Sequence, residues 1–156
     1  MVIIARNFII LITVALTYSI GYFKPAHNMD MIGYVASAFH ADGLSGIDLL
    51  EATYSDVDSA VSEETFSTHT TLTNYRATVY QDYRSLEQQL PFYTPRVLYI
   101  GAMKLLATFG FSYSEGTYLI SSIFASASVL VIAVMLKQLS LPVYLLPFIV
   151  VMSGLT

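Results

Sequence analysis

The sequence predicts an all-α fold: polytopic membrane helices, with an external loop of amphipathic helices between the first and second spans. Two observations lead to this fold class. Hydrophobic residues make up 55% of the 156 residues and charged residues only 12%, whereas charged residues are about 25% of an ordinary soluble domain. Ten of the eleven acidic residues lie between Asp30 and Glu87, so the polar groups are concentrated in one segment.

Composition also excludes several classes of function. The chain contains no cysteine, which rules out a disulfide framework and a thiolate metal site. Its net charge is −4 and it has no stripe of basic residues that would meet phosphates along a nucleic-acid groove. We therefore expect membrane lipid as a partner and no nucleic acid.

Residues 1–23 are predicted to form the first transmembrane helix. Asn7 to Phe23 is a stretch of seventeen uncharged residues that follows Arg6, and about 17 to 25 residues are needed to span the hydrocarbon layer. A cleaved signal peptide is the alternative. The end of the stretch has only a poor small-x-small cleavage site and carries aromatic residues typical of a membrane interface, which favours a retained anchor.

Residues 24–95 are predicted to form one external loop. It holds three basic and ten acidic residues, which gives a net charge of −7. Asn28 can cap a helix, because its side chain accepts a backbone N–H. The pattern that follows predicts an amphipathic helix directly after the first span. Its apolar face has Met29, Ile32, Ala36 and Phe39, and its polar face has Asp30, Tyr34 and Ser37.

The rest of the loop has weaker signals. Gly43 and Gly46 are expected to interrupt the first helix, and residues 48–66 are predicted to be a loop with room for a short helix. A second apolar stripe predicts one long amphipathic helix that ends at Pro91. The stripe consists of Leu72, Tyr75, Val79, Tyr83, Leu86 and Leu90.

Residues 96–110 are predicted to form an interfacial or re-entrant helix. The apolar part, 97–109, has thirteen residues with Lys104 in the middle, which is short for a span and lets the lysine stem reach back toward headgroups. With this helix at the surface, Arg6 and Lys137 both fall on the cytoplasmic side, where basic residues are in excess. The loop 24–95 then lies on the non-cytoplasmic side of a plasma or inner membrane.

Two more segments are apolar enough for the membrane. Residues 116–137 are predicted to be a transmembrane helix, and 141–156 the start of a further one. The last segment ends at Thr156 without a polar flank, so we expect the functional protein to have more helices. A small-residue face within 116–137 is suited to close helix packing in lipid. It consists of Ser121, Ser122, Ala125, Ser126 and Ser128.

Asp30 is the candidate catalytic residue. It lies seven residues after Phe23, on the polar face of a helix that can lie along the bilayer. An ionised carboxylate within hydrogen-bond reach of a hydroxyl group can act as a general base. The alternative is that Asp30 only completes the capping of its helix.

Basic side chains are the candidate phosphate ligands. Arg96 is the first of them, because a guanidinium offers paired donors to a phosphate, and Lys24 and Arg84 are reserves. His27 lies three residues before Asp30 and is a candidate neighbour of the site. The alternative for the cations is a role as headgroup anchors. No metal-ligating residues are predicted, because the histidines have no metal-ligand spacing.

The tripeptide Asp56-Val57-Asp58 has the D-x-D pattern that holds a metal–nucleotide pair in one class of sugar transferases. Those enzymes surround it with an α/β domain, which this sequence does not predict. An acidic loop produces such a triplet by chance, so we expect no metal–nucleotide site here.

The order of these parts resembles a known enzyme family. Pro25-Ala26-His27-Asn28-Met29-Asp30 opens an external helix after the first span, and Phe92-Tyr93-Thr94-Pro95-Arg96-Val97-Leu98-Tyr99 opens an interfacial one. The stretches 105–110 and 118–137 follow like the next helix pair of that family. In this order of parts the chain resembles the amino-terminal part of the GT-C superfamily of glycosyltransferases, as a truncated module.

The resemblance implies a reaction and a site. GT-C members are polytopic membrane enzymes that take a sugar from a polyprenyl-phosphate or polyprenyl-diphosphate carrier and pass it to an acceptor outside the cytoplasm, here a glycan, lipid or protein. An aspartate in the first external loop is typically the catalytic base, which implies this role for Asp30. Some members use a divalent cation and others do not, so the resemblance leaves that cofactor open.

Two departures from the family pattern are visible. Asp30 has no neighbouring acid, and the second acidic residue of a later external loop would lie beyond Thr156. We therefore expect this fragment alone to be inactive. The alternative function is a non-enzymatic polytopic protein, a transporter or an assembly subunit, whose loop is a binding surface. A transporter is expected to carry ionisable residues inside its spans, and the three spans predicted here hold none inward of Arg6 and Lys137.

Overall fold

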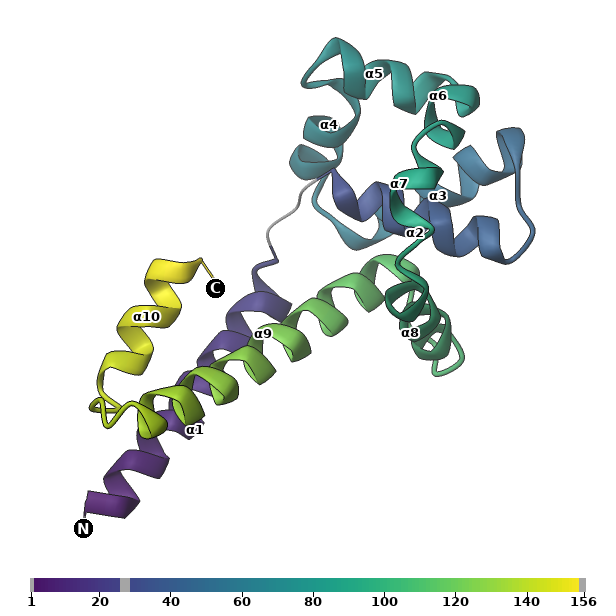
Figure 1. Ribbon diagram of the computed structural model, residues 1–156. Coiled ribbons are helices and arrows are strands. Elements are labelled where there is room, and N and C mark those ends of the chain that lie inside the picture. Colours follow the sequence, from purple (N-terminus) through teal and green to yellow (C-terminus); the bar gives the residue numbers. More distant parts are fainter. Residues whose placement is uncertain (1, 26–28, 155–156) are drawn as a thin grey trace. The chain divides into compact units, whose positions relative to one another are not determined.

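The computed structural model describes residues 2–25 and 29–154, and every regular element in these ranges is a helix. The predicted all-α fold class is therefore confirmed for the described residues. The helices form two compact units (Figure 1): unit 1 is Met1–Ala26 with Tyr118–Thr156, and unit 2 is His27–Thr117. The helices are α1 (Val2–Phe23), α2 (Asp30–Ala41), α3 (Gly46–Ala60), α4 (Glu63–Thr71), α5 (Asn74–Gln81), α6 (Tyr83–Glu87), α7 (Leu90–Tyr93), α8 (Val97–Ala107), α9 (Tyr113–Gln138) and α10 (Leu145–Ser153).

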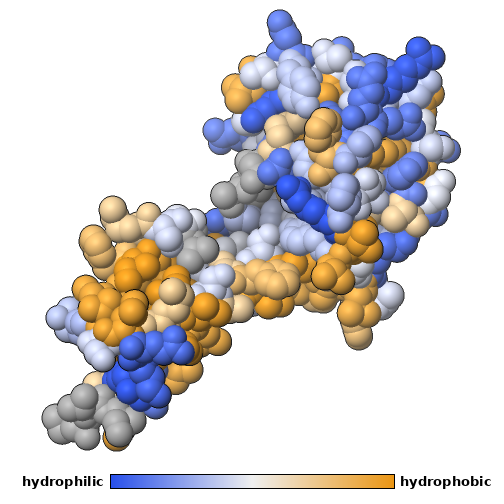
Figure 2. Space-filling view, viewed as in Figure 1, coloured by the Kyte–Doolittle hydropathy of each residue, from blue (hydrophilic) through white to orange (hydrophobic). Residues whose placement is uncertain are grey.

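Unit 1 contains α1, most of α9, and α10. Two helices of the described chain, Ile4–Phe23 and Tyr113–Gln138, are long and apolar enough to cross a membrane, as judged by length and composition. Their most apolar stretches are only 11% and 33% buried, whereas the core helix of a soluble protein is mostly buried. Figure 2 shows the resulting apolar surface over these helices of unit 1. Such a surface is what a lipid environment would cover.

Small side chains let α1 and α9 approach closely. Thr17 is buried on α1, and Ser122 and Ser126 are buried on α9. A Cβ atom added at Gly21 would lie 2.8 Å from the Ser122 hydroxyl oxygen. The Ser126 hydroxyl donates a 3.5 Å hydrogen bond to the carbonyl of Val14. The predicted small-residue face is confirmed at Ser122 and Ser126, one helical turn apart, whereas its member Ser121 points outward and is exposed.

The segment after α9, which is predicted to start a further span at 141–156, forms a turn and a short helix. A turn that contains Pro142 comes first, and α10 begins at Leu145 with Pro147 in its first turn, where a missing N–H is tolerated. This helix packs on α1 and α9 through an apolar cluster made of Val129, Ala133, Leu136, Leu146 and Val150.

Helix α2 is the centre of unit 2. It packs against α3, α7 and α8, and most of its residues are buried, including Ile32, Val35 and Ala36. Asp30 is exposed and Tyr34 half-buried, as the predicted polar face requires. The placement of Ser37 on that face is wrong, since Ser37 is buried. The reason is that α8 covers a second side of α2, which a pattern for a helix with one buried face does not anticipate.

The region between Gly46 and Tyr93 is more helical than predicted. Residues 48–66, predicted to be a loop, lie mainly in α3 and the start of α4. The buried face of α3 includes Thr53 beside Leu49 and Val57, and a threonine weakens the apolar periodicity that sequence reasoning depends on. Gly43 and Gly46 both have positive φ, so the predicted interruption after α2 is confirmed.

The single long helix predicted to end at Pro91 is wrong. Three short helices, α5, α6 and α7, replace it. The chain leaves the helical conformation at Asp82, whose carboxylate accepts the backbone N–H of Arg84 at 3.1 Å and the Ser85 hydroxyl at 2.8 Å. These bonds cap the start of α6, and α5 ends at the residue before Asp82. Pro91 lies in the first turn of α7 and does not end a helix.

Candidate functional site

Asp30 is held by a tyrosine from a distant part of the chain. It is the first residue of α2, and the Tyr93 hydroxyl at the end of α7 donates a 3.0 Å hydrogen bond to its Oδ1. Burial and this bond to Asp30 together raise the pKa of Tyr93 to about 12, so Tyr93 remains a donor at physiological pH. The carboxylate is otherwise exposed. It is thus oriented without being removed from solvent.

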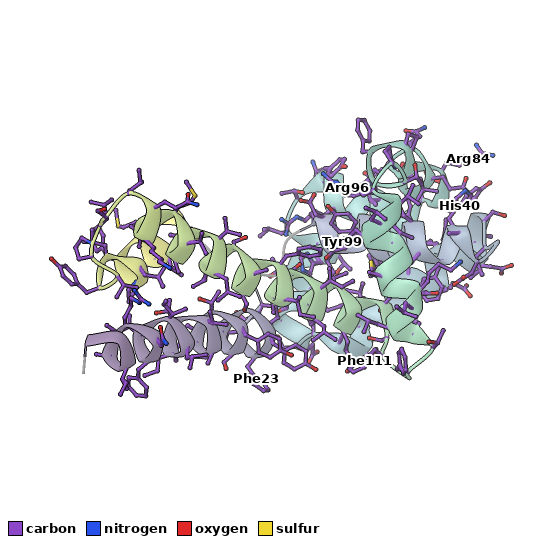
Figure 3. The ribbon with its side chains drawn as sticks, turned by 60° about the horizontal axis from the view of Figure 1, so that its bottom comes forward. Phe23, His40, Arg84, Arg96, Tyr99 and Phe111 are labelled. Atoms are coloured by element: carbon purple, nitrogen blue, oxygen red, sulfur yellow. The ribbon has the colours of Figure 1, made fainter. Side chains whose placement is uncertain are left out.

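Arg96 lies at the start of α8 and is stacked on two tyrosines. Its guanidinium carbon is 5.1 Å from the ring centre of Tyr34 and 5.7 Å from that of Tyr93, and it donates a hydrogen bond to the Tyr34 hydroxyl. Tyr99 lies against Tyr34, with ring centres 4.5 Å apart. Figure 3 shows Arg96 and Tyr99 side by side. Cation–π contacts of this kind restrict the arginine while its outer donors stay accessible.

These five residues form one cluster, which we call the Asp30–Arg96 cluster: Asp30, Tyr34, Tyr93, Arg96 and Tyr99. Burial raises the pKa of Tyr34, the positive charge of Arg96 lowers it and the negative charge of Asp30 raises it, with a net increase. Tyr34 is therefore within the field of both charges. Among the described residues the one ion pair is between Asp42 and Lys104, so Asp30 and Arg96 share the cluster without neutralising each other.

A pocket of about 250 Å³ opens between α2 and α8, beyond the Asp30–Arg96 cluster. Ser37 and His40 line it from α2, and Val97, Ile100 and Lys104 line it from α8. The Ser37 hydroxyl is buried and has no hydrogen-bond partner among the described residues. The pocket is mainly apolar, so it suits a hydrocarbon group better than a sugar.

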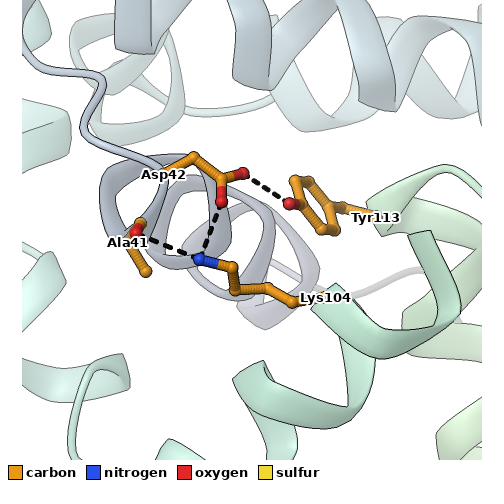
Figure 4. A network of polar contacts seen from close by, with 4 residues as sticks. All are labelled: Ala41, Asp42, Lys104 and Tyr113. Atoms are coloured by element: carbon orange, nitrogen blue, oxygen red, sulfur yellow. Dashed lines mark hydrogen bonds and ion pairs between the residues drawn. The ribbon is translucent and has the colours of Figure 1, made fainter. Parts of the chain in front are cut away.

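Lys104, which is expected to reach back toward headgroups, contacts Asp42 and Ala41 within unit 2. Its ammonium lies 2.7 Å from Oδ1 of Asp42 and donates a 3.0 Å hydrogen bond to the carbonyl of Ala41 (Figure 4). The Tyr113 hydroxyl donates to the other oxygen of Asp42. This network joins the end of α2 to α8 and to the first residue of α9. The role of Lys104 in unit 2 is therefore structural.

The remaining predicted phosphate ligands are not part of the cluster. Arg84 donates a 3.3 Å hydrogen bond to the Tyr83 hydroxyl, and Figure 3 shows it apart from Arg96. Lys24 is exposed just after α1, in unit 1, and its role at the site stays a prediction. His27 lies outside the described residues, as does the predicted cap Asn28.

The D-x-D tripeptide has a structural role. Asp56 accepts the backbone N–H of Tyr113 through Oδ2 at 3.0 Å and that of Ser114 through Oδ1 at 2.9 Å. It thereby satisfies two donors of the first turn of α9, and a helix N-terminus favours such a carboxylate. Val57 is fully buried. With both oxygens of Asp56 engaged, the tripeptide does not have the arrangement of a metal–nucleotide site.

Potential metal ligands are few around Asp30. No group of three or more His, Asp or Glu side chains in the described ranges could hold a metal ion. Asp30 is the one acidic member of its cluster, and a single carboxylate is a poor donor set for a divalent cation.

Sequence reasoning missed the tyrosines. Tyr34 follows Asp30 by one helical turn, and Tyr93 and Tyr99 flank Arg96 at three residues on either side. The spacing of Tyr34 from Asp30 is a signal, because residues four apart share a helix face, whereas Tyr93 ends α7 and Arg96 precedes α8, so they share no helix. The contacts themselves join residues 62 and 63 positions apart in the sequence, and such a distance is not readable from periodicity.

Comparisons with protein-family models, with curated proteins and with solved structures found no match to this chain.

Proposed function

We propose that this protein is a membrane glycosyltransferase that moves a sugar from a polyprenyl-phosphate-type lipid donor to an acceptor on the non-cytoplasmic face. The supporting observation is the Asp30–Arg96 cluster. An exposed carboxylate and an exposed guanidinium, far apart in sequence, both contact Tyr93. A base and a phosphate ligand are the two groups that such a transfer requires of a protein.

The membrane part of the proposal is supported by unit 1. Two helices have the length and apolar composition of spans. Arg6 and Lys137 lie at the ends expected to be cytoplasmic. At the other end of α1, Tyr22 and Phe23 make an edge-to-face contact with ring centres 5.2 Å apart, and Phe23 points outward (Figure 3). Aromatic residues are enriched at membrane interfaces.

The exposed side of α8 supports an interfacial position for that helix. Leu98 is 91% exposed, and Val97 and Leu105 are also exposed. Arg96 comes directly before this apolar side, at the level where the headgroup of a lipid donor would lie. The apolar pocket between α2 and α8 is lined by the next turns of the same helix.

In the proposed reaction, Asp30 removes the proton from an acceptor hydroxyl group. The acceptor oxygen forms a bond to the anomeric carbon of the sugar, the bond from that carbon to the phosphate oxygen breaks, and the configuration inverts. The lipid phosphate leaves with the bonding electrons, and Arg96 pairs with its negative charge. Tyr93 keeps Asp30 oriented, and the stacked tyrosines hold Arg96 in place before the donor binds.

The test compares Asp30→Asn with Asp48→Asn in membranes that contain the full-length protein. Asp48 is a matched control, because it is an exposed carboxylate in the first turn of α3. A general base contributes about 10² to 10⁴ in rate, so transfer of labelled sugar from the lipid donor should fall at least about 100-fold for Asp30→Asn only. Unchanged transfer at a normal protein level would sink the assignment and favour a non-enzymatic binding surface.

The phosphate role is tested by binding of a polyprenyl phosphate to Arg96→Gln and Arg84→Gln. Loss of a charge-assisted hydrogen bond costs about 1.5–3 kcal/mol, so the affinity should fall roughly tenfold or more for Arg96→Gln. Arg84→Gln should bind like the unchanged protein, since Arg84 contacts Tyr83 instead. Equal losses in the two variants would show a general charge effect and contradict the proposal.

A further inference from the structure

A pocket in unit 1 has two basic side chains in its wall. Its volume is about 390 Å³, and it lies between the first turns of α1, the last turns of α9 and the turn after α9. Arg6 lines it from α1, and Lys137 and Ser140 line it from the end of α9. Figure 2 shows a hydrophilic patch within unit 1 at this end of α1. The rest of the wall is apolar and includes Ile10, Leu130 and Val134.

The two cations have no acidic partner in unit 1. The segments 1–26 and 118–156 contain Arg6, Lys24 and Lys137 but no Asp or Glu. Neither Arg6 nor Lys137 forms an ion pair with a described residue. Lys137 lies in the last turn of α9, where the helix dipole favours a cation. Arg6 lies near the positive end of α1, where the helix dipole does not favour a cation. Neither this dipole nor an acidic side chain of unit 1 therefore stabilises the charge of Arg6.

Ser140 occupies an unusual backbone position beside these cations. Its φ is 56°, and it follows α9 in a Schellman turn, with Leu141 N–H bonded to the Leu136 carbonyl at 2.9 Å and Ser140 N–H to the Lys137 carbonyl at 3.2 Å. Glycine is the usual residue there, because a side chain strains the left-handed conformation. Serine instead adds a hydroxyl group to the pocket wall, in addition to the two cations.

We propose that this pocket binds the phosphate of an anionic phospholipid, with Arg6, Lys137 and Ser140 as donors and the apolar wall against the acyl chains. Charge complementarity supports this occupant, because basic pockets between membrane helices on the cytoplasmic side suit anionic headgroups. The inference rests on the membrane placement proposed above and does not depend on the transfer reaction.

The chain contains no tryptophan, so a single tryptophan can report on lipids at one place. Leu139→Trp puts the reporter beside the pocket without altering its wall, and Ile20→Trp puts it near the other end of α1. The protein is reconstituted in phosphatidylcholine vesicles with a small fraction of phosphatidylglycerol. Bromine on the acyl chains of one lipid or the other quenches the reporter in proportion to the local amount of that lipid.

We expect phosphatidylglycerol to be preferred beside the pocket and not at the Ile20→Trp reporter. Each basic side chain contributes about 1 kcal/mol at an anionic surface, or about fivefold, so the preference should be about 25-fold. Arg6→Gln and Lys137→Gln should each reduce it about fivefold. Lys24→Gln is the control, because Lys24 lies roughly 27 Å along α1 from Arg6, and it should change nothing at this reporter.

Ser140→Gly separates binding from stability. Glycine relieves the left-handed strain, so the variant should melt at a higher temperature, while the lipid preference, which depends on the two cations, should stay about 25-fold. Equal quenching by both lipids at the Leu139→Trp reporter, or an equal loss in Lys24→Gln, overturns the proposal. If millimolar glycerol phosphate removes the preference, the pocket takes a soluble phosphate and the lipid assignment is wrong. Absence of quenching at both reporters overturns the membrane placement as well.

Discussion

The ring of Tyr93 lies directly against the backbone of Gly33. A Cβ atom added at Gly33 would be 2.2 Å from Cε2 of that ring, a distance that real atoms do not reach. Gly33 is therefore the residue that lets α7 approach α2 and lets the Tyr93 hydroxyl reach Asp30. A position with no functional group of its own thus controls the geometry of the candidate site.

Gly33→Ala should destabilise unit 2 by about 1–3 kcal/mol, the usual cost of overpacking a core. It should also release Tyr93 from Asp30. In a Tyr93→Ala background, Gly33→Ala should instead increase the free energy of unfolding, because alanine is a better helix residue than glycine by about 1 kcal/mol. Urea unfolding followed by circular dichroism measures the four free energies of this cycle.

Gly101→Ala in α8 is the control for that cycle, since a Cβ atom there would meet nothing within 4 Å. It should stabilise the protein by a similar amount in both backgrounds. If Gly33→Ala stabilises the protein as much as Gly101→Ala while Tyr93 is still present, the close contact between α2 and α7 is absent in solution.

The ion pair of Asp42 and Lys104 should make stability depend on acid pH. Burial alone would raise the pKa of Asp42, but the hydrogen bonds from Lys104 and Tyr113 and the charge of Lys104 outweigh it and lower that pKa below 3.8. The unfolded chain therefore binds a proton more readily than the folded one. The contribution is complete above about pH 4 and is lost as the pH falls through the folded pKa.

Asp42→Asn should accordingly reduce the free energy of unfolding at pH 7 and have a smaller effect near pH 2. The side chains of Lys104 and Asp42 are 37% and 33% exposed, so solvent screening limits the change to about 1 kcal/mol or less. Denaturation curves at several pH values measure it. The same difference at pH 2 and pH 7 would contradict the role of the ion pair.

Asp56→Ala tests the structural role of the D-x-D tripeptide. The substitution removes the acceptor of two backbone N–H groups at the start of α9, which should cost about 1–3 kcal/mol. Asp58→Ala, two residues further along at an exposed position, should cost less than about 0.5 kcal/mol. If both variants lose sugar transfer equally and keep their stability, the result would instead support a metal–nucleotide role for the tripeptide.

The contact of α1 with α9 can be tested by a disulfide, since the natural chain has no cysteine. A Cβ atom at Gly21 would lie 3.4 Å from Cβ of Ser122, near the 3.5–4.5 Å typical of disulfides. The variant with Gly21→Cys and Ser122→Cys should oxidise to an intramolecular disulfide in membranes, seen as a mobility shift on non-reducing gels. Gly21→Cys with Ser121→Cys should not, because Ser121 lies about 100° further around α9. Similar crosslinking of both pairs would mean that α1 rotates freely.

Helices were predicted correctly from the sequence where one physical effect dominates. Long uncharged runs predict α1 and α9, and the positive-φ glycines Gly43 and Gly46 end α2 as predicted. The sequence was a poor guide where two effects compete, as at Asp82, where a side-chain cap interrupts an apolar stripe that would otherwise continue. It also failed at α3, whose buried face includes the polar Thr53.

The candidate site could likewise be predicted only in part. Asp30 and Arg96 could be selected singly, one as a carboxylate at a helix start and the other as a guanidinium beside an apolar helix. Their common contact with Tyr93 could not be predicted, because it depends on the break at Asp82 and on the close approach of Tyr93 to Gly33. Both are consequences of tertiary packing, which overrides local patterns.

The absence of acids from unit 1 has a consequence for the electrical behaviour of the protein. In the proposed arrangement the charges of Arg6, Lys24 and Lys137 lie at helix ends, and the apolar stretches between them carry none. A charge must move through the membrane field to respond to voltage, at about 2.3 kcal/mol per elementary charge and 100 mV. With no such charge inside these spans, unit 1 should not respond to a change of the membrane potential.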